Sequence, residues 1–290
     1  MVLQLTRSGL DRGAAPPRLA DLPRPQLPPI VVKPRRQFGR PAFFAGDSAE
    51  AKSAGARLSG HYGNHDLRSA DVIVALGGDG LMLRTLHRHL SDNVPLFGMN
   101  RGSLGFLMNE FREDGLLARL RQAESSIVHP LRMVARDAAG NLHEALAINE
   151  VSLFRQTHQA GKLKVSVDGT VRLPELVCDG ILLATPVGST AYNLSVGGPI
   201  LPINAPLLAL TPISPFRPRR WRGAVLPDRA RVTIEVLEPE KRPMAAVANH
   251  REFEAVREVT ISAMCEVGIE MLFDPGHALD ERILSEQFQF

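Results

Sequence analysis

The sequence predicts an α/β domain with a parallel sheet, followed by a mostly antiparallel β domain. In the first half of the chain, short apolar runs alternate with helix-forming segments at short spacing, which is typical of parallel βαβ units. After about residue 127, strand-like runs follow one another with turn signals between them, and a helical pattern returns only near the end. We therefore expect an α/β domain over residues 37–126, a β-rich domain over 127–275 and a terminal helix within 276–290.

The composition favours a soluble protein from a reducing compartment. At 290 residues the chain is long enough for two domains with a sizeable core, and 44% of its residues are hydrophobic. Its apolar runs stay well short of the roughly 18 residues that span a bilayer. The net charge of +3 is slight and does not indicate a nucleic-acid partner. The two cysteines, Cys178 and Cys265, have no C-x-x-C spacing, so we expect a cytoplasmic protein without a disulfide framework.

Residues 1–36 differ from the rest of the chain. They carry seven prolines, scattered arginines and almost no hydrophobic periodicity. Such a segment cannot bury enough surface to offset the entropy of ordering, so we expect a disordered extension outside both domains. It also lacks the apolar core of a secretory signal.

The elements of the first half follow from apolar runs and capping residues. Asp47 and Ser48 can cap the first helix, and the later helices follow the glycines that end the strands. The expected order is strand Pro41–Ala45, a helix to about Leu58, strand Val72–Leu76, helix Leu81–Leu90, strand Val94–Asn100 and helix Glu113–Ser125.

The second half reads mainly as strands. Asp137–Asn141 is a turn signal between two strand-like runs, so a hairpin is expected there. The expected strands are Arg132–Arg136, Leu142–Leu146, Glu150–Phe154, Leu163–Val167, Gly180–Ala184, Arg231–Leu237, Met244–Ala248 and Val267–Phe273, before a helix at Leu279–Phe290.

The segment Gly77-Gly78-Asp79-Gly80 carries the first chemical signal. It follows Val72–Leu76, an unbroken apolar run that indicates a strand buried on both faces, and precedes a helix. Glycine backbone and a helix N-terminus form a phosphate site. A carboxylate there would repel phosphate unless it accepts a proton or holds Mg²⁺, so Asp79 is a candidate catalytic group. The alternative is that Asp79 only caps the helix.

Three further polar clusters follow. Asn100–Leu107 comes after the next strand and should lie at the same sheet edge, where open α/β sheets bind ligands. Asn149-Glu150 interrupts an apolar run, where polar groups are costly unless satisfied. Asp179–Pro199 is dense in hydroxyl and amide groups suited to ribose and phosphate, and its Tyr192 can stack on a ring. The structural alternatives for the three clusters are, in the same order, a glycine-rich connection, a hairpin corner and a spacer loop.

Together the four clusters resemble the NAD kinase family. Its marks are G-G-D-G, N-x-G-x-L-G-F, an N-E pair, and D-G…T-P-x-G-S-T-A-Y followed by G-G-P. They occur here in order as Gly77–Gly80, Asn100–Phe106, Asn149-Glu150, and Asp179–Tyr192 with Gly197–Pro199. The resemblance covers residues 38–290. G-G-D-G alone also marks diacylglycerol and sphingosine kinases, whereas G-S-T-A-Y is more specific to enzymes acting on NAD.

The resemblance implies a fold and a reaction. The fold is a Rossmann-like N-terminal domain with a C-terminal β-sandwich, assembled as dimers or tetramers. The reaction is transfer of the ATP γ-phosphate to the 2′-hydroxyl of the adenosine ribose of NAD, giving NADP. We expect Mg²⁺ or another divalent cation to arrive with ATP, and we expect no structural metal and no membrane or nucleic-acid partner.

The resemblance also implies roles for individual residues. Asp79 is the expected proton acceptor. The expected NAD-binding residues are Asp79, Gly80, Arg84, Asn149, Glu150, Asp179, Val187, Thr190, Ala191, Tyr192, Asn193, Leu194 and Ser195. The expected phosphate-binding residues for ATP are Gly77, Gly78, Gly80, Asn100 and Gly102.

Three positions depart from the family pattern. Leu81 stands where many members have threonine, so that hydroxyl is missing. Ala248–Arg251 replaces a D-G-Q segment, which removes a glutamine contact. Pro215-Phe216 replaces a P-H segment, which removes a histidine. The proposed base is untouched, so activity is still expected.

Three alternatives stay open at the level of sequence. The cluster Arg217–Arg222 is interpreted as a surface or subunit contact, with a nucleic-acid patch as the alternative. A lipid kinase would share the G-G-D-G chemistry, but the polar Thr185–Ser195 loop does not suit an acyl chain. A non-catalytic NADP-binding regulator would keep the pocket without turnover, against which the intact Asp79 argues.

Overall fold

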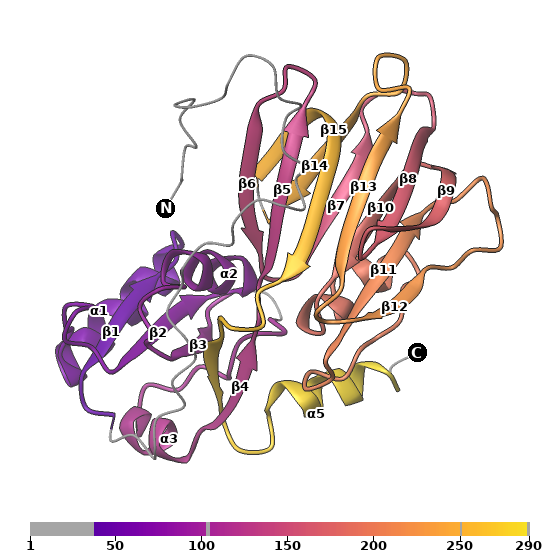
Figure 1. Cartoon of the computed structure of the whole chain (residues 1–290). Coiled ribbons are helices and arrows are strands. Elements are labelled where there is room, and N and C mark those ends of the chain that lie inside the picture. The colour runs from indigo at the N-terminus through magenta and orange to yellow at the C-terminus, as the bar shows by residue number, and fades with distance from the viewer. Residues whose placement is uncertain (1–37, 103–104, 250, 289–290) are drawn as a thin grey trace. The chain divides into compact units, whose positions relative to one another are not determined.

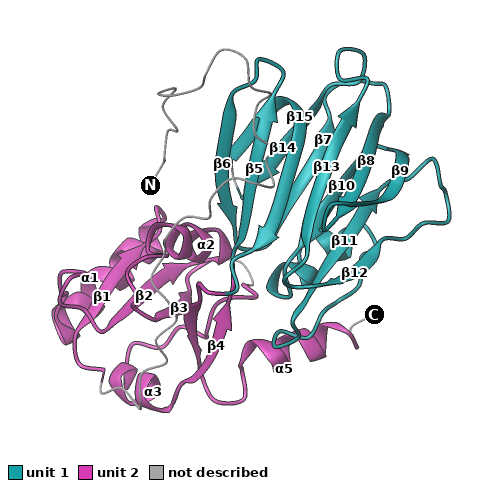
Figure 2. Cartoon of the chain, in the orientation of Figure 1, with its two compact units in different colours: residues 1–26, 130–265 teal, residues 27–129, 266–290 magenta. Residues whose placement is uncertain are grey.

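The computed structural model describes residues 38–102, 105–249 and 251–288. These residues fall into two compact units, drawn in separate colours in Figure 2. One unit is α/β and holds the described residues up to 129 together with those from 266 onward. The other is the β-rich stretch 130–265. The extension expected over residues 1–36 lies outside the described residues.

The α/β unit contains a five-stranded, mostly parallel sheet, visible in Figure 1. Its strand order is β1-β2-β3-β16-β4, and β1, β2, β3 and β16 run parallel. The strands are β1 (Pro41–Ala45), β2 (Val72–Gly77), β3 (Leu96–Asn100), β4 (Glu124–Val128) and β16 (Ile269–Phe273). The helices are α1 (Ala49–Tyr62), α2 (Asp79–Arg88), α3 (Leu116–Gln122) and α5 (Leu279–Glu286).

The apolar run of β2 is buried along its whole length, as its sequence predicts. Every side chain from Val72 to Leu76 is fully buried. Val72, Val74 and Leu76 share a core cluster with Leu58 of α1 and Leu116 of α3. Since side chains alternate across a strand, Ile73 and Ala75 face the opposite side of the sheet. A strand buried on both faces holds the residues at its end rigidly, and Asp79 follows directly.

Two expectations for the α/β unit were wrong in detail. The helix expected over Glu113–Ser125 is shorter, because Gly115 adopts a left-handed conformation (φ 69°) before α3, and β4 begins at Glu124. The strand expected at Val267–Phe273 forms as β16, but it pairs with β3 and β4 and not with the β-rich unit. Its Leu272 belongs to the α/β core, which explains the choice of sheet.

The β-rich unit is one eleven-stranded sheet whose neighbouring strands pair antiparallel, and the sheet forks at β15. The first half of β15 pairs with β14, whereas its second half pairs with both β13 and β5. The strands are β5 (Leu131–Asp137), β6 (Leu142–Ala147), β7 (Glu150–Arg155), β8 (Gly161–Val167), β9 (Thr170–Cys178), β10 (Gly180–Ala184), β11 (Leu207–Ile213), β12 (Ala224–Pro227), β13 (Arg231–Leu237), β14 (Met244–Ala248) and β15 (Arg251–Ala263).

The two branches of this sheet enclose one hydrophobic core. Met133 of β5 and Ile234 of β13 belong to the same buried cluster as Leu153 of β7 and Ile181 of β10. The expected sandwich is therefore present as two layers of a single sheet. A second cluster covers the other face of β10, where Leu182 packs with Leu201. This second cluster anchors the loop between β10 and β11.

Among the described residues, the helices are too short and too polar to cross a membrane.

Candidate active site

Asp79 occupies the first position of α2, directly after β2 and Gly78. Its two carboxylate oxygens each accept a backbone hydrogen bond. Phe106 N donates to Oδ2 at 2.7 Å, and Leu107 N donates to Oδ1 at 2.8 Å. Each carboxylate oxygen can accept more than one hydrogen bond, so acceptor capacity remains for a ligand hydroxyl. The carboxylate is thus held in one orientation at the carboxyl edge of the parallel sheet.

The expected phosphate-binding glycines lie on two adjacent turns. Arg101 N, after β3, donates to Gly77 O at 2.7 Å, and Gly102 N donates to Asn100 Oδ1 at 3.0 Å. A Cβ built on Gly102 would lie 3.8 Å from Gly78 N, so the second turn reaches the first. These contacts bring the motifs after β2 and β3 together at one sheet edge, as the sequence predicts.

Gly77 and Gly78 have different surroundings. A Cβ on Gly77 would lie 2.7 Å from Leu81 Cδ2 and 3.1 Å from Leu81 Cβ, so Gly77 is required by packing. A Cβ on Gly78 would meet nothing within 4 Å. The backbone of Gly78 is therefore open to an incoming group. One turn along α2, Arg84 Nη1 lies 3.7 Å from the Cβ position of Gly80, which places a cation beside the same turn.

Asn149 and Glu150 form the corner between β6 and β7 in the β-rich unit. Thr185 ties this corner to the end of β10, because its N donates to Asn149 O at 2.9 Å and its Oγ1 donates to Ile148 O at 2.7 Å. Gly188 packs so tightly here that a Cβ would lie 2.1 Å from Asn149 O. The corner therefore has one fixed backbone conformation.

The Glu150 carboxyl is the most perturbed acid of this corner. Burial raises its pKa from 4.5 to about 7. Its Oε2 is buried and has no hydrogen-bond partner among the described residues. Near neutral pH this carboxyl can therefore donate or accept a hydrogen bond. Burial, and after it the negative charge of Glu150, raise the pKa of the Tyr192 hydroxyl.

The loop after β10 is internally braced. It contains a 3₁₀ turn, Val187–Thr190, and the short helix α4, Tyr192–Ser195. Asn193 is fully buried, and its Nδ2 donates to Ser189 O and Pro199 O while its Oδ1 accepts from Thr211 Oγ1. Asn193 and the buried Val187 thus support the loop from inside. Thr190, Ala191, Tyr192, Leu194 and Ser195 keep at least part of their surface accessible to solvent.

Asp179 lies at the other end of β10 from Glu150. In the β7–β10 register, Glu150 is opposite Ala184 whereas Phe154 is opposite Gly180. The strand rise makes this separation roughly 13 Å. Asp179 Oδ1 accepts from Arg155 Nε at 2.6 Å. Asp179 and Glu150 therefore lie at opposite ends of β10.

Comparisons with known proteins assign the chain to a family. The profile described as ATP-NAD kinase N-terminal domain matches residues 39–122, and the profile described as ATP-NAD kinase C-terminal domain matches residues 148–265. The NAD kinase of Caulobacter vibrioides is 58% identical over 258 residues, which cover 89% of this chain and 99% of that protein. The NAD kinase of Rhizobium meliloti is 56% identical over 253 residues, covering 87% and 98%. This chain belongs to the NAD kinase family.

Solved NAD kinase structures share the fold. A yeast NADH kinase complexed with NADH has a TM-score of 0.75 at 19% identity, covering 88% of this chain and 89% of that one. An NAD kinase from Archaeoglobus fulgidus in complex with ATP has a TM-score of 0.66 at 22% identity, covering 85% and 98%.

The three departures from the NAD kinase pattern have structural counterparts. Leu81, at the position where many NAD kinases have threonine, packs against Gly77. Asn249 Oδ1 accepts from Ile148 N and its Nδ2 donates to Leu146 O, so this side chain holds the corner before Asn149. Phe216 is exposed, with the Arg219 guanidinium 4.8 Å from its ring centroid.

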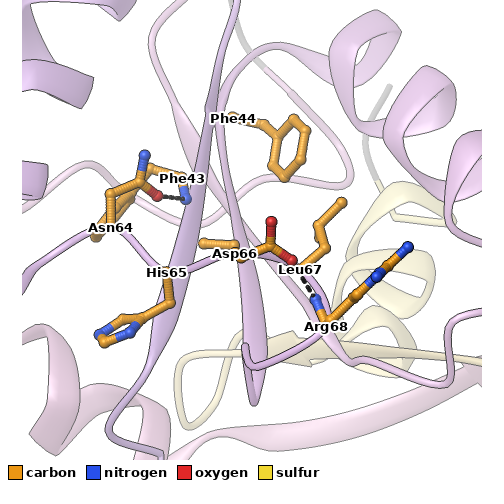
Figure 3. Close-up of a pocket in the computed structure, with 8 residues that line it drawn as sticks. Phe43, Phe44, Asn64, His65, Asp66, Leu67 and Arg68 are labelled. Atoms are coloured by element: carbon orange, nitrogen blue, oxygen red, sulfur yellow. Dashed lines mark hydrogen bonds between the residues drawn. The ribbon is translucent and has the colours of Figure 1, made fainter.

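A cavity of about 430 Å³ in the α/β unit is separate from the NAD kinase motifs (Figure 3). It lies beside β1 and the segment 64–68, and Asp79 is not among its lining residues. Asn64 Oδ1 accepts from Phe43 N at 2.9 Å, and His65 N donates to Pro41 O at 3.0 Å. The segment therefore covers the free edge of β1, which is an architectural role.

Sequence reasoning missed the groups that hold Asp79. Backbone N–H donors at Phe106 and Leu107 cannot be recognised from their side chains. The neighbouring Gly105 is the one residue type that could have pointed to them, since a Cβ there would lie 2.9 Å from Asp79 Oδ1. Within the described ranges, no cluster of three or more His, Cys, Asp or Glu side chains is arranged to bind a metal.

Proposed function

We propose that the chain transfers the γ-phosphate of ATP to the 2′-hydroxyl of the adenosine ribose of NAD, forming NADP. Family membership supports this activity, as do the names of relatives that match nearly their whole length. The observation that carries the proposal is the fixed Asp79 carboxylate beside the open backbone of Gly78. That arrangement supports a proton acceptor next to a phosphate site as the proposed catalytic pair.

Asp79 is the proposed proton acceptor. A ribose hydroxyl is a poor nucleophile at neutral pH, and a carboxylate within hydrogen-bond reach orients it and takes its proton as the bond to phosphorus forms. The N–H groups of Phe106 and Leu107 occupy one acceptor site on each oxygen. The remaining acceptor sites receive the hydroxyl proton.

The turns after β2 and β3 are the proposed phosphate site. Gly77, Gly78, Gly80, Asn100 and Gly102 supply backbone N–H groups and the N-terminus of α2. We propose Mg²⁺, or another divalent cation, bound chiefly by the ATP phosphate oxygens. This agrees with the single carboxylate, Asp79, on these turns, because Mg²⁺ commonly binds through one or two carboxylates together with substrate phosphates.

The proposed NAD-binding groups of the β-rich unit are Asn149, Glu150, Asp179 and the loop after β10. Tyr192, Thr190 and Ser195 are accessible and present a ring and two hydroxyls. Val187 and Asn193 are buried and shape the loop, while Ala191 and Leu194 complete its surface. Gly80 and Arg84 of α2 are proposed to contact NAD along with Asp79.

We also propose a cytoplasmic, homo-oligomeric enzyme of two or four subunits. Cys178 is a buried free thiol, which fits a reducing compartment. The basic cluster Arg217–Arg222 is proposed to lie on the surface without binding nucleic acid, because its Trp221 packs in part against the core of the β-rich unit.

The test is an assay of the purified full-length chain with ATP and Mg²⁺. NADP formation is followed with an NADP-specific dehydrogenase, and parallel reactions replace NAD with diacylglycerol or sphingosine. The proposal predicts turnover with NAD and none above background with either lipid. Phosphorylated lipid without NADP would support the lipid kinase instead, and NADP binding without turnover would support the regulator.

A further inference from the structure

The guanidinium of Arg282 binds the loop that holds Asp79. Arg282 lies on α5, near the end of the chain, in the same compact unit as Asp79. Its Nη1 donates to Met108 O at 2.7 Å and to Phe106 O at 2.8 Å, and it lies 3.5 Å from Gly105 O. Its Nε donates to His277 O at 2.8 Å. Nη1 and Nε are thus both directed to backbone carbonyls.

These carbonyls belong to the peptide groups that bind Asp79. Phe106 C=O and Leu107 N–H form one peptide group, with Arg282 at its oxygen and Asp79 at its nitrogen. The preceding group, Gly105 C=O with Phe106 N–H, has the same two neighbours. A cation at a carbonyl polarises the peptide and strengthens the hydrogen bond at its N–H. Arg282 and Asp79 are therefore coupled through two peptide groups.

The charges on either side are consistent with this coupling. Burial lowers the pKa of the Arg282 guanidinium, while the negative charges of Asp79 and Asp274 raise it. An arginine placed to bind substrate phosphate would keep its donors directed to the ligand. Here Nη1 and Nε are directed to four carbonyls of the protein itself.

The same loop is braced a second time by the C-terminal segment. Asn109 is buried, and its Nδ2 donates to Gly98 O and Leu272 O while its Oδ1 accepts from Asp274 N. The Asp274 carboxylate in turn accepts two hydrogen bonds from Arg119, from Nε at 3.0 Å and from Nη2 at 2.6 Å. These bonds fix the loop at Asn109, next to the residues 105–108 that Arg282 contacts.

We propose that Arg282 is a positioning residue for phosphoryl transfer, which orients the Asp79 carboxylate through the peptide groups of residues 105–107. This inference rests on the proposed function in so far as the oriented carboxylate is the proton acceptor. Its structural part, the restraint of residues 105–108 by Arg282, does not depend on the reaction.

The test compares Arg282→Gln and Arg282→Lys with Arg121→Gln, which removes an exposed arginine from α3. Turnover and KM are measured for NAD and ATP, and hydrogen exchange is measured at the amides of Phe106 and Leu107. Arg282→Gln should lower kcat roughly tenfold to a hundredfold, as expected for loss of a charge-assisted hydrogen bond, with a smaller change in either KM. Arg282→Lys should recover part of kcat, and Arg121→Gln should change nothing.

A double-mutant cycle with Asp79→Ala separates positioning from a general loss of stability. Without the carboxylate there is nothing left to orient, so Arg282→Gln should lower the residual turnover by less than about threefold. The inference is overturned by an equal loss in both backgrounds, or by unchanged kcat. Amides that exchange as slowly in Arg282→Gln as in the wild type also overturn it. If Arg282→Gln does not fold, the Arg282→Lys cycle decides by the same criteria.

Failure of the proposed function would look different. A wild-type chain that forms no NADP contradicts that function alone, and the exchange rates of the two amides still test the restraint by Arg282.

Discussion

Adjacent glycines at the carboxyl end of β2 have different roles, which single substitutions separate. Gly77 is closed off by Leu81, whereas Gly78 faces open space with an ordinary φ of −114°. Gly77→Ala should therefore destabilise the fold by about 1–3 kcal/mol, the usual cost of overpacking. Gly78→Ala should leave the thermal midpoint nearly unchanged and raise KM for ATP, because its methyl group meets only the ligand.

Thermal melts and ATP titrations of the two variants check this pair. An unchanged KM for ATP in Gly78→Ala would remove Gly78 from the phosphate site. A stable Gly77→Ala would show that Leu81 can move aside.

The buried Glu150 predicts a dependence of stability on pH. Its pKa is 4.5 when unperturbed and about 7 in the folded chain, so between these values the folded state binds more protons than the unfolded state. The stability that depends on the neutral Glu150 carboxyl is therefore fully present below pH 4.5. It is lost as the pH rises through about 7. The loss is at most about 3 kcal/mol for this shift.

Glu150→Gln should remove that dependence. Relative to the wild type, the variant should gain free energy of unfolding at pH 8 and gain little at pH 5, measured by denaturant titration. Equal differences at both pH values would show that Glu150 is not held in its neutral form.

At the scale of elements, the loop after β10 should bind NAD and not ATP. Tyr192 is 37% exposed, and its ring lies 5.8 Å from that of Phe154, so it is supported on one side and accessible on the other. Tyr192→Ala should raise KM for NAD by the equivalent of about 1–3 kcal/mol, the usual cost of losing an aromatic stacking partner. KM for ATP should hardly change, and an effect confined to ATP would refute the assignment.

Apolar runs and alternating patterns predicted most strands, but β4, β9, β11, β12 and β15 were not predicted. Val72–Leu76 is apolar throughout because both faces of β2 are buried. β15 was not predicted, since charged side chains such as Arg251, Glu252 and Glu254 interrupt the pattern in its exposed first half. β16 was predicted as a strand but in the wrong domain, because an apolar pattern reports burial and does not identify the neighbouring strand.

The candidate site was likewise predictable only in part. Side chains with unusual chemistry at strand ends, such as Asp79 and Glu150, stand out in the sequence. The support of Asp79 does not, because it comes from backbone N–H groups and from Arg282 close to the opposite end of the chain.

At the scale of the whole molecule, we expect residues 1–36 to be dispensable for activity. The family profiles begin at residue 39, and the Caulobacter vibrioides relative matches 99% of its own length while covering 89% of this chain. Deleting residues 1–36 should leave the thermal midpoint and turnover intact. A large fall in either on truncation would show that the segment is part of the fold.

The most direct test of the account is the turnover of Asp79→Asn. An amide is a far poorer proton acceptor than a carboxylate, so kcat should fall by roughly 10²–10⁴-fold, the usual contribution of general-base catalysis. Since Phe106 N and Leu107 N both donate to this side chain, the amide also places a donor against a donor, and NAD affinity is measured as the control. The account predicts the loss of kcat with a much smaller change in NAD affinity. Retention of more than about a tenth of wild-type turnover would contradict proton abstraction by Asp79.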